Sequence, residues 1–196
     1  MGLSATSATM KKFLIVVGFV VLTALVLVSC NNTDSMKKTT LQNLDSSIVS
    51  LFQALDSDDR EEMQVLFRSI NSFGSNTNRE YLMGVLDGIH RGLNPTHIIT
   101  STLPTPSILS PALLEHLQRT YHAELVLINE LYNFLGHEPT RNIPSDFLML
   151  LPDIQKSLGT ICTFNLTSQA FNQESYCNAL SSYAALLETA TITLMN

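Results

Sequence analysis

The chain has 196 residues, a formal net charge of −6 and 45% hydrophobic residues. An acidic chain without a run of basic residues is a poor ligand for nucleic acid or for anionic lipid surfaces, so both classes of partner are excluded as direct binding targets. The length suffices for one ordinary domain with a buried core.

The first 29 residues have the features of a secretory signal. Lys11 and Lys12 form a basic segment, and residues 13–28 after it are uncharged and almost entirely apolar. This order, followed by a small residue before the cut, is typical of a cleavable signal. Met10 is the expected natural start, because it opens the basic segment directly. Cleavage before Cys30 leaves 167 residues and, without the two lysines, a net charge of −8.

The end of this signal, Leu27-Val28-Ser29-Cys30, resembles the lipobox of bacterial lipoproteins. The resemblance implies that the thiol of Cys30 is acylated and that Cys30 becomes the first residue of the mature protein. Two or three acyl chains, at about 0.8 kcal/mol per buried CH₂, hold a protein stably at a membrane. The domain is then expected in the cell envelope, facing the periplasm or the exterior, and Asn31 favours the outer membrane by the same analogy.

Two other interpretations of this segment stay open. The apolar run is slightly short for a membrane-spanning helix of about 20 residues, but an uncleaved signal anchor would also place the domain outside the cytoplasm. Residues 1–6, Met-Gly-Leu-Ser-Ala-Thr, fit a myristoylation pattern that is common by chance.

Cys162 and Cys177 are the two cysteines left after Cys30. In an oxidising compartment an even pair predicts a disulfide, whose closure is worth roughly 3 kcal/mol at this spacing in the chain-entropy model. Two buried thiols are the alternative.

From residue 40 onward the sequence has helical periodicity. Residues 30–39 are polar and predict a tether, and residues 40–196 are expected to form one helical domain. An apolar stripe at positions 41, 44, 48, 51 and 55 predicts a first helix. Asp58 to Glu61 is expected to cap a second helix that ends at Gly74, and Thr77 to Glu80 resembles a capping box that opens a third.

The second half of the domain continues this pattern. Ser110 followed by Pro111 predicts the start of a long helix that runs to about Leu135. Residues 145–158 predict a fifth helix, kinked or divided at Pro152. A last helix is expected to begin between residues 168 and 174 and to run to Leu194. The fold class is therefore an all-α bundle of five or six helices behind an N-terminal signal and lipid anchor.

No residue pattern indicates catalysis, a cofactor or a metal. Asp87 and His90 lie three residues apart, but two ligands do not make a metal site. Glu115, His116 and Glu124 invite a di-iron interpretation, yet the required Glu-x-x-His spacing is missing. The HExxH, G-x-S-x-G, P-loop and G-x-G-x-x-G motifs are missing too. We therefore expect a protein that is not an enzyme, and no small-molecule substrate is inferred.

Two features are candidates for a protein-binding surface. Gly84, Gly88 and Gly92 recur every fourth residue and allow close approach of another helix, either inside the bundle or in a partner. The stretch 94–109 holds three prolines and no charge, and it predicts a long loop that is either packed on the bundle or free to bind a partner. The apolar residues of this stretch are Ile98, Ile99, Leu103, Ile108 and Leu109.

These observations favour a lipid-anchored protein whose helical domain binds or assembles another envelope protein. An immunity or inhibitor lipoprotein is the first alternative. An envelope hydrolase without a recognisable motif is the second, and it predicts a polar cleft with a histidine near a serine or a carboxylate.

Overall fold

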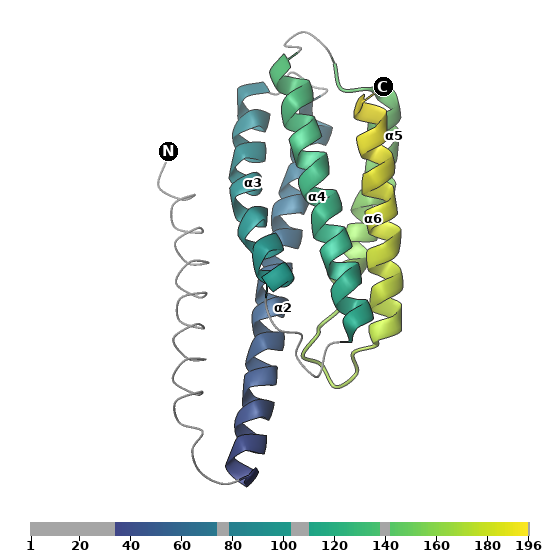
Figure 1. Ribbon diagram of the computed structural model, residues 1–196. Coiled ribbons are helices and arrows are strands. Elements are labelled where there is room, and N and C mark those ends of the chain that lie inside the picture. The colour runs from purple at the N-terminus through teal and green to yellow at the C-terminus, as the bar shows by residue number, and fades with distance from the viewer. Residues whose placement is uncertain (1–33, 74–78, 103–109, 138–141, 196) are drawn as a thin grey trace.

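The computed structural model describes residues 34–73, 79–102, 110–137 and 142–195. This part of the chain forms five α-helices and no strand, which confirms the predicted all-α class. None of its helices is both long and apolar enough to cross a bilayer. The helices, shown in Figure 1, are α2 (Asp34–Phe73), α3 (Arg79–Thr102), α4 (Pro111–His137), α5 (Ser145–Ile161) and α6 (Gln173–Met195).

The five helices form a closed ring. α2 packs on α3, α3 on α4, α4 on α6, α6 on α5, and α5 returns to α2. The direction of the chain alternates from one helix to the next (Figure 1). α6 packs against both α5 and α4. It runs parallel to α4, while the other adjacent pairs are antiparallel.

The core fills the inside of this ring with large apolar side chains from every helix. Their burial supplies the main favourable term for folding, because each large apolar side chain removed from water contributes roughly 1.5–3 kcal/mol. Fully buried members from the successive helices include Phe67, Leu86, Leu127, Phe147 and Leu187.

α2 is one continuous helix, and the predicted break at residues 58–61 is wrong. The sequence from 41 to 73 contains neither glycine nor proline, so nothing in the backbone forces an end. Asp56 and Arg60, one turn apart, form an ion pair inside the helix. Residues 34–39, predicted as part of a tether, are also helical.

The first turns of α2 extend beyond the bundle. Figure 1 shows the N-terminal part of α2 passing the ends of the other helices. Among the side chains that the structure describes, none before Ile48 is buried. At 1.5 Å per residue the 14 residues 34–47 span about 21 Å. The domain therefore carries a helical stalk at this end.

α3 extends further than the sequence predicted. Residues 94–102, expected to begin a long loop, are helical, so this part of the prediction is wrong. Pro95 removes one backbone donor from the helix, but no other proline or glycine follows before Thr102, and the helix continues. Ile98 and Ile99 are thus helical residues. Leu103, Ile108 and Leu109 lie outside the described residues, as does Thr77 of the predicted capping box.

The remaining helix limits agree with the sequence. The hydroxyl of Ser110 accepts a hydrogen bond from the backbone N–H of Leu113 at 3.1 Å, which confirms the predicted cap of α4. α5 passes through Pro152 as a single helix and ends at Ile161, so the predicted alternative of a division at this proline is wrong. α6 begins at Gln173, inside the predicted range, and ends one residue after Leu194.

Candidate functional site

A cluster of charged and phenolic side chains lies inside the ring, in a core that is otherwise mainly apolar, although Asp59 is buried there as well. We call it the Arg60 cluster; it consists of Asp56, Arg60, Tyr121, Glu124, Tyr176 and Tyr183. α2 supplies the first two residues, α4 the next two and α6 the last two. The Arg60 side chain is 2% exposed and that of Glu124 is fully buried. Because an unpaired charge at such a depth costs several kcal/mol, the partners of each group decide whether the cluster is stable.

Arg60 is held between two carboxylates. Its Nη2 donates to Oδ1 of Asp56 at 2.8 Å, and its Nη1 donates to Oε1 of Glu124. Its guanidinium carbon also lies 5.3 Å from the ring centre of Tyr121 and 5.7 Å from that of Tyr183. Burial alone would lower the pKa of Arg60, but the two carboxylates raise it well above its ordinary value. Arg60 is therefore a permanent cation.

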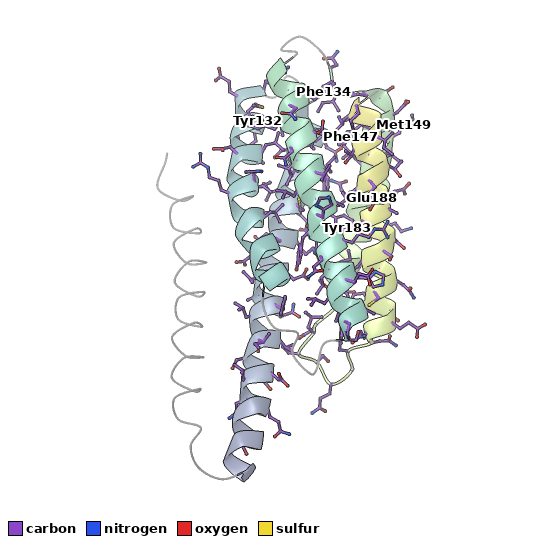
Figure 2. The ribbon with its side chains drawn as sticks, in the orientation of Figure 1. Tyr132, Phe134, Phe147, Met149, Tyr183 and Glu188 are labelled. Carbon is purple, nitrogen blue, oxygen red and sulfur yellow. The ribbon has the colours of Figure 1, made fainter. Side chains whose placement is uncertain are left out.

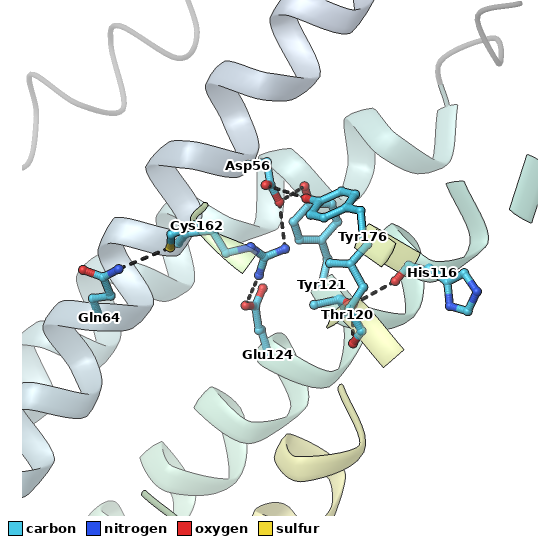
Figure 3. Close-up of polar contacts among 10 residues, drawn as sticks. Asp56, Gln64, His116, Thr120, Tyr121, Glu124, Cys162 and Tyr176 are labelled. Carbon is cyan, nitrogen blue, oxygen red and sulfur yellow. Dashed lines mark hydrogen bonds and ion pairs between the residues drawn. The ribbon is translucent and has the colours of Figure 1, made fainter. Parts of the chain in front are cut away.

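Asp56 is the acceptor that joins three helices. In addition to Arg60, its Oδ1 accepts a hydrogen bond from the hydroxyl of Tyr121 at 3.0 Å, and its Oδ2 accepts one from Tyr176 at 2.8 Å (Figure 3). Burial and the charge of Asp56 raise the pKa of both phenols well above the ordinary value of 10. Both hydroxyls therefore remain protonated donors.

Glu124 has a strongly shifted pKa. Burial raises the pKa of Glu124 from 4.5 to about 7, although the charge of Arg60 acts in the opposite direction. Its second oxygen and the hydroxyl of Tyr183 are both buried without a hydrogen bond of normal geometry to the described residues. Burial raises the pKa of Tyr183 most, and the nearby charge of Glu124 raises it further. Glu124 thus exchanges a proton near neutral pH.

A polar pocket of about 290 Å³ opens beside this cluster, and we call it the Arg60 pocket. One wall is a face of α2 that presents a run of polar residues from Gln53 to Arg68, with Arg60 at its floor. The other wall is the end of α5 and the segment after it, including Cys162 and Phe164. The Nε–H of Arg60 is buried and has no hydrogen-bond partner among the described residues.

The segment that follows α5 is fixed on this wall by contacts to two helices. The backbone N–H of Leu166 donates to Oε1 of Gln53 on α2 at 2.6 Å. The ring of Tyr176 on α6 lies 5.0 Å from that of Phe164 and 5.6 Å from that of Phe171, measured between centroids. These contacts hold the pocket wall in one position relative to the cluster.

The predicted disulfide does not form, and both cysteines are free. Cys162 is exposed at the end of α5, where Nε2 of Gln64 lies 3.3 Å from its Sγ (Figure 3). Cys177 is buried near the start of α6. Their side chains face different neighbours, because Cys162 is turned toward α2. Burial raises the pKa of each thiol, which disfavours the reactive thiolate.

The glycine stripe on α3 is divided between two environments. Gly84 and Gly88 are exposed, and a side chain built on either would meet no atom within 4 Å. Gly92 is buried, and a Cβ there would contact the carboxylate of Glu62 on α2. The close approach expected inside the bundle therefore applies to Gly92 alone, while a partner surface at Gly84 and Gly88 stays a prediction.

Within the described residues, no three histidine, cysteine, aspartate or glutamate side chains come together as a metal site needs. Asp87 accepts a hydrogen bond from Arg91 at 2.7 Å on the exposed face of α3. Nδ1 of His116 lies 3.1 Å from the hydroxyl oxygen of Ser181. This pair has one element that a hydrolase would need, but neither residue lines the Arg60 pocket. The His116–Ser181 pair and the Arg60 pocket are therefore separate features.

Sequence patterns indicated Glu124 only as a rejected iron ligand and assigned no role to Arg60. The sequence of α2 did contain a signal for a buried charged cluster. Its buried positions follow one helical period through 48, 52, 55, 59, 63, 66 and 70. Charged residues at 56, 59 and 60 interrupt this apolar face, and charged residues at core positions indicate buried ion pairs.

No known protein family, curated protein or solved structure matches the chain.

Proposed function

We propose that this chain is a lipid-anchored protein of the cell envelope whose helical domain binds or assembles another envelope protein. The anchor is Cys30, and the supporting observation is the lipobox-like sequence behind a basic and apolar signal. α2 begins at Asp34, four residues after Cys30, so little chain separates the lipid from the stalk. The stalk would hold the bundle about 20 Å from the membrane surface.

One observation carries the proposal of a protein partner. Four large apolar side chains are exposed at the end of the bundle where α5 begins and α6 ends: Leu148, Met149, Ile192 and Met195. Met149 and Met195 are 69% and 68% exposed, and Ile192 is 58% exposed. Exposed apolar side chains that gather at one place are typical of binding surfaces, and methionine adapts well to a partner. We call this set the apolar end.

The position of the apolar end favours a protein over a lipid as its partner. It lies at the opposite end of the bundle from the start of α2, as Figures 1 and 2 show for the end of α6 and for Met149. A domain anchored through Cys30 would therefore point this end away from its own membrane. Another envelope protein with an apolar patch is the partner that fits this geometry.

Photo-crosslinking in intact cells tests this proposal. A photoreactive amino acid placed at Met149 should give one defined adduct, identified by mass spectrometry as a different envelope protein. The same residue at Glu115, an exposed position on α4, is the matched control and should give none. Ile192→Glu should abolish the adduct at Met149 without unfolding the domain, because Ile192 is exposed. Cys30→Ser should release the protein from membranes and reduce the adduct.

Three outcomes would contradict the proposal. An adduct at twice the mass of the chain would identify a second copy as the occupant of the apolar end. Equal adducts at Met149 and Glu115 would show that no surface is preferred. Unchanged membrane attachment of Cys30→Ser, with an unprocessed mass, would remove the lipid anchor and leave a signal anchor.

A further inference from the structure

The Arg60 pocket has the charge balance of a site for a neutral ligand. Two of the three nitrogens of Arg60 are already occupied by carboxylates, so its charge is compensated before any ligand enters. The walls then add one further cation, Arg68, and one further anion, Glu61. A free anion would meet Asp56 and Glu61, and a free cation would meet two guanidinium groups. Neither is favoured over a neutral molecule.

The polar groups of the pocket both donate and accept hydrogen bonds. The guanidinium of Arg68 is exposed on the face of α2 that lines the pocket and can donate to a ligand. Glu61 is an exposed acceptor on the same face of α2, and Ser57 beside it can act in either role. Hydroxyl groups match such a set, because each can accept from the guanidinium and donate to a carboxylate.

Apolar surface and size restrict the ligand further. Phe164 lines the wall opposite α2 and is partly exposed, so its ring provides a surface for C–H groups. The volume of about 290 Å³ is near the lower end of the range of about 300–1,000 Å³ for ligand sites. A single ring with several hydroxyls fits this space, whereas a dinucleotide does not.

The geometry points to the Arg60 pocket as a binding site for a small neutral polyhydroxylated ligand, with the chemistry of one sugar unit. In this arrangement Gln64 and Arg68, on the accessible face of α2, donate to ring or hydroxyl oxygens, Glu61 accepts from a hydroxyl, and Phe164 covers the C–H face. The site is independent of Cys30 and of the apolar end. Its ligand would bind between α2 and the segment after α5, whose position relative to α2 is held by the bond from the Leu166 N–H to Gln53.

Nuclear magnetic resonance titration of the full chain tests this inference. The ¹⁵N-labelled protein is prepared in micelles of a detergent that contains no sugar, and N-acetylglucosamine and glucose are the probes. At least one of them should shift the amide signals of Cys162, Phe164 and Leu166 saturably, with a dissociation constant of about 1 mM or below. Acetate and methylammonium, a smaller anion and a smaller cation, should leave these signals in place.

Variants on the rim of the pocket keep the test independent of folding. Arg60 itself is unsuitable, because its loss would leave buried carboxylates unpaired. Glu61→Gln and Gln64→Ala lie on the accessible face of α2, and each should weaken binding by about tenfold. Glu115→Gln removes the same charge from an exposed site outside the pocket and should not change the affinity.

The result that overturns the inference is equally specific. Saturable shifts with acetate or methylammonium and none with the two sugars would identify an ion site instead. Sugar-induced shifts that Glu61→Gln and Glu115→Gln change equally would place binding elsewhere. The absence of saturable shifts with every probe would show that the pocket holds only water.

Discussion

Two arginine–carboxylate pairs join helices of this bundle in opposite environments. Arg60 contacts Glu124 deep inside the ring, with 2% of its side chain exposed, whereas Arg119 of α4 contacts Glu188 of α6 at the surface, with 46% exposed. The chemistry is the same in both, so the difference lies in the surroundings. A buried pair couples two desolvated charges to each other, and a surface pair remains solvated by water and screened by salt.

The buried pair also has more partners. Arg60 reaches Asp56, and Asp56 receives two phenolic hydroxyls, so that α2, α4 and α6 are joined through one acceptor. Arg119 makes two parallel hydrogen bonds, of 2.9 and 2.8 Å, to one carboxylate. The buried network is therefore expected to set the positions of three helices, and the surface pair to add little.

Loss of the buried cation should have the largest effect. Arg60→Met keeps most of the volume but leaves Asp56 and Glu124 without their counter-charge. At pH 8, where Glu124 is mostly ionised, the free energy of unfolding should fall by about 4 kcal/mol. Urea denaturation followed by circular dichroism measures this fall.

Two comparisons decide whether the charge is responsible for that effect. Arg91→Met removes an exposed cation and should change the free energy of unfolding by less than about 0.5 kcal/mol. Adding Glu124→Gln to Arg60→Met should restore part of the lost stability. If the double variant is as unstable as the sum of both changes, loss of packing rather than an unpaired charge explains the result.

Titration of Glu124 should have a smaller effect, with a definite sign. Its pKa is about 7 in the folded protein and 4.5 when unperturbed, so the folded state holds the proton more tightly than the unfolded state. The stability that this proton contributes is complete below about pH 4.5 and is lost as the pH rises through about 7. Between about pH 5 and 8 the loss should be on the order of 2 kcal/mol.

Glu124→Gln isolates this titration from that of other groups, including the histidines. The glutamine is neutral at every pH, so the free energy of unfolding of the native chain should decline with pH relative to that of the variant. Parallel curves for the two proteins from pH 5 to 8 would mean that Glu124 does not titrate in this range.

Sequence periodicity predicted the helices but not how they meet. The limits of α4 and α6 followed from Ser110, Pro111 and the apolar repeat, because caps and periodicity are local. The ring order was not predictable, since an apolar face does not specify which helix covers it. The contact of Arg60 with Glu124 joins positions 64 residues apart and depends on that order.

The wrong predictions have local causes. A charged run at 58–61 resembles a helix start, and a proline at 95 resembles a helix end, yet both helices continue through these positions. The disulfide was inferred from an even number of cysteines, which carries no information on orientation. Cys162 is turned toward Gln64 of α2, and this direction depends on the pairing of α5 with α2.

The surface pair should have the smallest effect, although its geometry is the better of the two. Hydrogen bonding to Glu188 raises the pKa of Arg119, and that of Glu188 is lowered, but both groups are largely exposed. A double-mutant cycle with Arg119→Ala and Glu188→Ala should give a coupling energy below about 1 kcal/mol, and this should shrink in about 1 M salt. A coupling that approaches the effect of Arg60→Met and resists salt would mean that the bidentate geometry, rather than burial, determines how strongly such a pair holds α4 to its neighbour.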